Sequence, residues 1–111
     1  MDIITRLEEA ILIAIWRLEG NAYGVPINTH VSQSLRKNYS MGALYFALDQ
    51  LLRKGYVHKT AKNFYNQKGG RSRTYYNLSS RGKKALQEAR SYQRSLWDGI
   101  PELVFEAKKS K

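Results

Sequence analysis

The stretch of sequence that decides the fold reads Ser40-Met41-Gly42-Ala43-Leu44-Tyr45-Phe46-Ala47-Leu48-Asp49-Gln50-Leu51-Leu52-Arg53-Lys54-Gly55. Ser40 is a favoured helix N-cap and Gly55 a favoured helix stop, so the stretch predicts a short helix. Its leucines recur at three- and four-residue steps and form one apolar face: Leu44, Leu48, Leu51 and Leu52. Phe46 falls on the opposite side, so the helix is predicted to expose a large aromatic side chain that the core does not use.

Two strands are predicted directly after this helix, at residues 56–61 and 74–78. The side chains expected to face the core are those of Val57, Tyr76 and Leu78, and those expected to face away are Lys59, Arg73, Tyr75 and Asn77. The loop between the strands, residues 62–73, holds four cations and no acid, and a Gly-Gly pair marks its tip. A helix with one apolar face, joined to a cationic hairpin, can fill a DNA major groove while the hairpin grips the neighbouring backbone.

Helices are also predicted on both sides of this unit. The first, residues 4–18, is apolar over more than one stripe, which indicates a second buried side against a partner subunit. The second opens at residues 23–26. The fourth runs from Ser80 to about Leu96 with a weak heptad that suits pairing with another helix, and residues 102–105 are expected to add a last helical turn.

These elements predict an α+β fold, a winged helix-turn-helix with a C-terminal dimerisation helix. We expect residues 1–78 to form the DNA-binding domain, with three helices and a two-stranded wing, and residues 79–111 to form the dimerisation helix and a tail. The core is expected to contain Leu12, Ile15, Ile27, Val31, Leu44, Leu48, Leu51, Val57, Tyr76 and Leu78.

The charge of the chain indicates a polyanionic partner. The 111 residues carry a formal net charge of +10. Between Arg53 and Arg94 there are 12 cations and a single acid, Glu88, whereas the first half is nearly balanced. So localised a charge favours a binding face for nucleic acid or an anionic membrane, with a solvated basic surface as the alternative.

Several classes of protein are disfavoured by the sequence. The chain has no cysteine, which excludes disulfides and thiolate metal sites and suits a reducing interior. Its N-terminus is unlike a signal peptide, and its longest uncharged apolar stretch, residues 10–16, is far short of the roughly 20 residues that a bilayer requires, so we expect a soluble cytoplasmic protein without membrane partners. His30 and His58 are the only histidines, and we find no carboxylate pair or phosphate loop. We therefore expect neither an enzyme nor a metal or cofactor site.

The sequence resembles the PadR-like transcriptional regulators, bacterial winged-helix proteins, in their short form with a single C-terminal helix. The resemblance covers roughly residues 5–97 and rests on segments in one unbroken order: residues 7–12, 22–27, 40–45, 55–57, 69–71 and 75–79, with Leu48, Leu51 and Gly82. It implies a homodimer that binds a roughly palindromic operator, usually as a repressor. It also implies that the C-terminal helix dimerises, sometimes around a pocket for an aromatic or drug-like effector.

The candidate DNA-binding residues lie in the third helix and the wing. Base edges are expected to be read by Met41, Gly42, Ala43 and Phe46, and phosphates to be contacted by Tyr45, Arg53, Lys62, Lys68, Arg71 and Arg73. Ser40 caps the helix whose N-terminus meets the duplex. Ser40 could instead serve only as a cap, Tyr45 could belong to the core, Phe46 could cover a dimer contact, and the wing arginines could be solvated. Because the base-reading set is small and apolar, DNA shape is expected to contribute to specificity.

Trp97 and Trp16 are the candidate effector-binding residues. The resemblance implies an aromatic residue in this part of the last helix that stacks on flat ligands, and ordinary dimer-core packing is the alternative. Two other functions compete with DNA binding. One is a winged helix used as a protein-interaction module, which the 12 clustered cations disfavour. The other is a peripheral membrane protein, whose cations would have to line one amphipathic helix.

Overall fold

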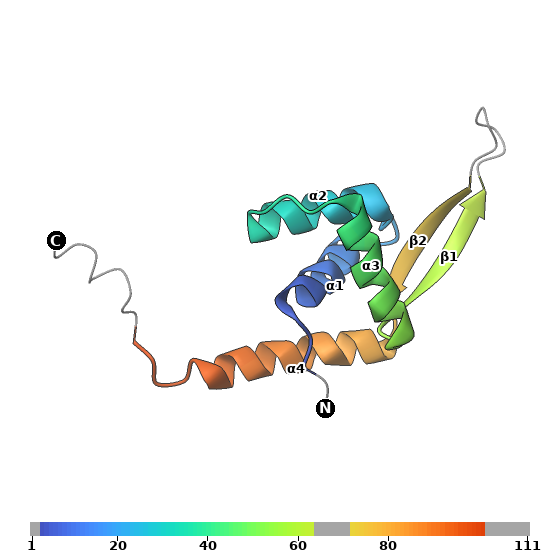
Figure 1. Cartoon of the computed structure of the whole chain (residues 1–111). Coiled ribbons are helices and arrows are strands. Elements are labelled where there is room, and N and C mark those ends of the chain that lie inside the picture. The colour runs from blue at the N-terminus through green and yellow to red at the C-terminus, as the bar shows by residue number, and fades with distance from the viewer. Residues whose placement is uncertain (1–2, 64–71, 102–111) are drawn as a thin grey trace, which may run out of the picture.

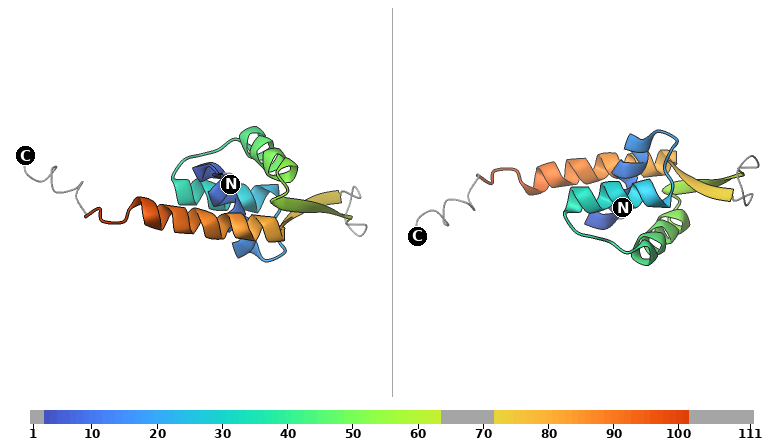
Figure 2. Two further views of the ribbon diagram at one scale, coloured as in Figure 1. Left: turned by 90° about the horizontal axis from the view of Figure 1, so that it is seen from below. Right: turned by 90° about the horizontal axis from the view of Figure 1, so that it is seen from above.

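The computed structural model describes residues 3–63 and 72–101, with the backbone alone at residues 62, 63 and 72. Its elements follow in the order α1 (Arg6–Leu18), α2 (Gly24–Leu35), α3 (Met41–Arg53), β1 (Val57–Asn63), β2 (Ser72–Leu78) and α4 (Ser80–Leu96). Helices α1 to α3 form the body, the hairpin of β1 and β2 projects from it, and α4 runs along its base and beyond it (Figure 1). Helices α2 and α4 lie on opposite sides of the body (Figure 2). The predicted α+β winged helix-turn-helix with a C-terminal helix is confirmed.

The element bounds differ slightly from those predicted. Helix α1 begins two residues later than expected because Thr5 is its N-cap. The Thr5 hydroxyl accepts a hydrogen bond from the Glu8 backbone at 3.0 Å, and the Glu8 carboxylate accepts one from the Thr5 backbone at 2.9 Å, which is a capping box. Both strands extend nearer to the loop than expected. Helix α4 has the predicted bounds, and the predicted turn at residues 102–105 lies outside the described residues.

The core lies between the three body helices and the base of the hairpin. Nine of the ten predicted core residues are buried, and the tenth, Leu78, is half-buried and packs against the others. The prediction was wrong for Tyr75, which was expected to face away from the core. Its side chain is only 8 % exposed, because the Tyr23 ring from before α2 packs edge-on against it at 5.5 Å. Both faces of β2 are therefore covered.

The register of the hairpin corrects the face predicted for Lys59. Strands β1 and β2 are antiparallel, with Val57 opposite Leu78 and Lys59 opposite Tyr76. Since directly opposite residues share a face, Lys59 lies on the same face as Val57, and not on the other face as expected. It is nevertheless exposed, although Tyr76 directly opposite is buried.

The start of α4 is fixed by a close contact with the turn between α3 and β1. The Ser79 hydroxyl donates to the Gly55 carbonyl at 2.6 Å and accepts from the Gly82 backbone at 2.9 Å. The Ser79 backbone donates to the Tyr56 carbonyl at 3.1 Å. Gly82 packs so closely on Tyr56 that an added Cβ would overlap the Tyr56 carbonyl oxygen. This junction sets the direction in which α4 leaves the body.

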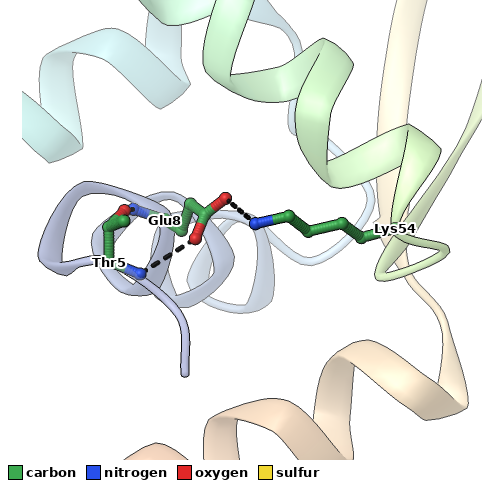
Figure 3. A network of polar contacts seen from close by, with 3 residues as sticks. All are labelled: Thr5, Glu8 and Lys54. Atoms are coloured by element: carbon green, nitrogen blue, oxygen red, sulfur yellow. Dashed lines mark hydrogen bonds and ion pairs between the residues drawn. The ribbon is translucent and has the colours of Figure 1, made fainter. Parts of the chain in front are cut away.

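An ion pair links the N-terminus of α1 to the end of α3. The Lys54 ammonium lies 2.7 Å from the carboxylate of Glu8, whose side chain is almost fully buried (Figure 3). Burial alone would raise the pKa of Glu8, but the hydrogen bonds from Lys54 and the Thr5 backbone outweigh it, so the pKa lies below the ordinary 4.5. Lys54 is one of the 12 clustered cations, and this contact directs it into the fold.

Replacing Glu8 by glutamine should lower the free energy of unfolding at pH 7 by about 1.5 kcal/mol. Because the pKa of Glu8 is lower in the folded than in the unfolded protein, its contribution is complete above about pH 4.5 and is lost as the pH falls through the folded value. The difference in free energy of unfolding between wild type and variant should therefore decrease as the pH falls from 5 to 3. Urea unfolding followed by circular dichroism measures this difference. Glu9→Gln, at the neighbouring position, is the control. A difference of the same size at pH 5 and at pH 3 would contradict a stabilising role of the ionised Glu8 carboxylate.

Candidate nucleic-acid interface

Helix α3 separates a buried face from an exposed one. Its buried side chains are those of Leu44, Ala47, Leu48 and Leu51. The Ser40 side chain caps the helix by accepting from the Ala43 backbone at 3.1 Å. The opposite face carries Gly42, Ala43 and Phe46 in exposed positions, and the Phe46 side chain is 68 % exposed. An isolated aromatic side chain with this exposure contributes little to the core, so this face is available to a partner.

The turn between α2 and α3 is held by a network that involves Met41. The Asn28 side-chain amide donates to the Tyr39 carbonyl at 2.9 Å and to the Met41 sulfur at 3.1 Å. The Ser32 hydroxyl in turn donates to the Asn28 side-chain oxygen at 2.9 Å. Met41 is therefore half-buried and engaged in fixing the turn, in contrast to the exposed Ala43 and Phe46. Nothing in the sequence singles out Asn28, whose role is identifiable only once the two helices are placed.

Tyr45 is exposed, but its ring also packs against the start of α2. Its side chain is 46 % exposed, so it is not a core residue. Its ring packs over the first residue of α2, Gly24, where an added Cβ would lie 2.9 Å from the Tyr45 ring and overlap the hydroxyl. The absence of a side chain at Gly24 thus lets Tyr45 cross from α3 to the start of α2. The Tyr45 hydroxyl lies against Gly24.

The cations near α3 differ in how they are held. Arg53 is exposed and lies 3.6 Å from Asp49, one turn earlier. An exposed pair of this kind is weak, so the guanidinium can turn toward a phosphate. Lys62 is the second-last residue of β1 and lies opposite Arg73 in the register. Lys68 and Arg71 lie outside the described residues.

Arg73 is the cation of the wing with the best-defined surroundings. Its guanidinium carbon lies 4.1 Å from the centre of the Tyr23 ring. A side-chain hydrogen bond with Tyr75, and after it the proximity of Tyr23, raise the pKa of Arg73 further. The side chain is exposed, yet it is in contact with two tyrosines. The role of Tyr23 could not be predicted, because nothing in the sequence places the segment before α2 beside β2.

Within one chain, Trp16 and Trp97 lie at different sites. Trp16 is 64 % exposed and lines a groove of about 720 Å³ between α1 and α4, with Ile13, Leu86 and three cations. Trp97 is the C-cap of α4, is 58 % exposed, and does not line this groove. A single chain therefore does not bring the two indole rings into one pocket.

The described residues contain neither a metal cluster nor a membrane span. In residues 3–63 and 72–101, no three histidine, aspartate or glutamate side chains are grouped so that they could hold a metal ion. In the same part of the chain, no helix has the length and apolar character needed to cross a bilayer.

Comparisons with known proteins point to one family. Residues 11–88 match the Transcriptional regulator PadR-like family. The fold is similar to a PadR-like transcription factor from Bacteroides fragilis, with a TM-score of 0.71, 23 % identity and coverage of 85 % of each chain. A PadR family transcription regulator from Clostridium difficile gives a TM-score of 0.68 and 24 % identity, over 83 % of this chain and 91 % of that one. A PadR-like transcriptional regulator from Bacillus cereus gives 0.66 and 24 %, over 81 % and 82 %. The search of curated proteins found no match.

Proposed function

Because the chain belongs to the PadR-like transcriptional regulator family, and is a DNA-binding transcriptional regulator and not an enzyme, we propose that it acts as a homodimeric repressor on a roughly palindromic operator. The observation that carries the proposal is the outer face of α3, where Phe46 is exposed in a chain of net charge +10. An exposed helix face beside a cationic hairpin suits insertion into a major groove. Repression follows where the operator overlaps a promoter, because the bound dimer occupies the DNA that polymerase must enter.

The proposed DNA contacts divide by chemistry. Met41, Ala43 and Phe46 would read base edges through apolar contacts, and Gly42 lets the helix approach the bases closely. Met41 would also support the turn. Ser40 and the N-terminus of α3 would face a phosphate. The remaining phosphate contacts would come from Tyr45, Arg53, Lys62, Lys68, Arg71 and Arg73. Met41 and Ser40 thus have structural roles as well as proposed DNA-contacting ones.

The proposed dimer uses the second half of α4. The first half packs on the body at α1 and β2, so residues 1–78 with the start of α4 would form the DNA-binding unit. Beyond it α4 leaves the body (Figure 1), and the exposed apolar side chains at its end and just after it are those of Leu96, Trp97 and Ile100. In a two-fold dimer each copy gives and receives the same contact. The end of α4 from one copy would therefore lie in the groove beside Trp16 of the other, and two α3 helices would then reach half-sites about 34 Å apart.

The proposal is tested by the salt dependence of DNA binding in the intact dimer. Light scattering of the free protein should give about twice 12.8 kDa. Five proposed phosphate-contacting cations per copy predict that log K falls with log salt concentration with a slope of about −9, measured by fluorescence anisotropy. A monomeric protein would remove the two-half-site arrangement. DNA binding that is absent, or indifferent to salt, would instead favour a protein-interaction module.

We also propose that a small aromatic effector binds to the dimer. The dimer would bring Trp97 of one copy toward Trp16 of the other, and indole rings stack on planar compounds. A ligand that prefers a dimer with altered spacing of the two α3 helices would release the operator. Titration of a planar aromatic dye should quench tryptophan emission in the wild type and bind at least about tenfold more weakly to Trp97→Leu. Equal dye affinity in the two proteins would leave Trp97 as a dimer contact only.

A further inference from the structure

The base of the wing carries a cluster of three side chains from two distant parts of the chain. Tyr23 comes from the segment before α2, and Arg73 and Tyr75 come from the same face of β2. The Tyr23 and Tyr75 rings meet edge to face at 65°, with centroids 5.5 Å apart, and the Arg73 guanidinium lies over the Tyr23 ring at 4.1 Å. Both contacts have the geometry that is favourable for their type.

The backbone fixes Tyr23 beside the wing. The Tyr76 backbone N–H donates to the Ala22 carbonyl at 2.8 Å, so the residue before Tyr23 is bonded directly to β2. Tyr23 itself is the N-cap of α2, with an extended backbone and no side-chain capping bond. Its ring is therefore not needed to cap the helix. It lies instead against the buried Tyr75.

This position constrains the side chain of Arg73. With its carbon 4.1 Å above the Tyr23 ring, the guanidinium is confined on that side, and its five N–H donors allow it to bond Tyr75 and further partners. Stacking and the bond with Tyr75 also restrict the rotamers of a long, exposed side chain. The freedom that a mobile arginine would lose on binding DNA is then already lost in the folded protein, so binding is favoured.

We propose that Tyr23 is a positioning residue that holds Arg73 in the orientation needed to contact the DNA backbone, and that it thereby couples the wing to the helix-turn-helix. The inference rests on the proposed function. It also changes the role of the wing, because Arg73 is then a preorganised contact and not a mobile surface charge. Tyr23 need not touch DNA itself.

A double-mutant cycle in the intact chain tests whether Tyr23 acts through Arg73. The probe is a fluorescein-labelled duplex of mixed sequence, since phosphate contacts do not require an operator. Tyr23→Leu should weaken binding about three- to fivefold and make the salt slope shallower, whereas Tyr23→Phe keeps the ring and should bind like the wild type. In an Arg73→Gln background, Tyr23→Leu should cause no further loss. In a Lys59→Gln background, which removes an exposed cation of the other strand, the full loss should remain.

The outcomes separate this inference from the proposed function. If the wild type binds no duplex, the proposed function fails. If it binds and the losses from Tyr23→Leu and Arg73→Gln simply add, Tyr23 acts independently of Arg73 and the inference is overturned. Should Tyr23→Leu unfold, as judged by circular dichroism, Arg73→Lys provides the second measurement. It keeps the charge but loses the planar group that stacks, and should bind about threefold more weakly. Wild-type affinity in Arg73→Lys would overturn the inference equally.

Discussion

Replacing Gly82 by alanine should lower the free energy of unfolding by about 3 kcal/mol, the largest effect on stability that we expect from a single methyl group in this protein. The added Cβ would overlap the carbonyl oxygen of Tyr56 and lie 3.0 Å from its carbonyl carbon. These are backbone atoms, so no side-chain rotation can make room. The carbonyl also accepts the Ser79 backbone N–H at 3.1 Å, so moving it away would weaken the junction that starts α4.

A second helical glycine provides the matched control. Gly42 lies in the first turn of α3, and an added Cβ there would approach only the Ser40 hydroxyl, at 3.9 Å. Because alanine favours a helix over glycine, Gly42→Ala should leave stability unchanged or raise it by up to about 1 kcal/mol. Urea unfolding of both variants measures the contrast. Equal stability of Gly82→Ala and the wild type would show that α4 can shift on the body without cost.

The position of α4 also matters for DNA binding, since in the proposed dimer it sets the separation of the two α3 helices. In a Gly82→Ala protein that remains folded at low temperature, the affinity for an operator should therefore fall more, relative to the wild type, than the affinity for a single half-site. Equal losses of affinity for the operator and for the half-site would show that the substitution acts within the DNA-binding unit instead.

The sequence predicted the elements whose signals are local. Ser40 caps α3 as its type and position indicate, and α4 has its predicted bounds. The leucines of α3 face the core because their spacing matches one helix face. The capping box of Thr5 and Glu8 has an equally local pattern, whereas hydrophobicity alone predicts a helix that begins at Ile4, two residues before the observed start.

Contacts between distant segments could not be predicted in the same way. Tyr75 was placed on an outer face because strand alternation assumes one covered side, and the cover comes from Tyr23, 52 residues earlier. The ion pair of Glu8 with Lys54 joins the start of α1 to the end of α3, so one of the 12 clustered cations is engaged within the fold. These pairings follow from how the helices pack, which periodicity does not specify.

Phe46 should determine which DNA sequence the protein prefers. Its side chain is 68 % exposed, so its removal leaves the core intact. In a major groove, a phenyl ring and the neighbouring Ala43 methyl can read sequence mainly by packing on the C5-methyl group of thymine. We therefore expect thymine within each half-site. On an operator selected from a random duplex pool, Phe46→Ala should bind about 30-fold more weakly, or about 2 kcal/mol for the two copies, and bind unrelated duplexes nearly as the wild type does.

Substitution of thymine by uracil isolates this contact, because it removes the methyl group and leaves base pairing unchanged. The wild type should lose about tenfold in affinity for an operator with uracil at the contacted positions, whereas Phe46→Ala should be insensitive to the change. Uracil placed outside the half-sites is the control and should have no effect on either protein. Binding is measured by fluorescence anisotropy at one salt concentration, since the electrostatic part of the binding free energy varies with salt. If Phe46→Ala weakens binding to every duplex alike, Phe46 supports the fold and does not read bases. If it reduces only operator binding but uracil has no effect on the wild type, Phe46 acts through groove shape and not through the thymine methyl.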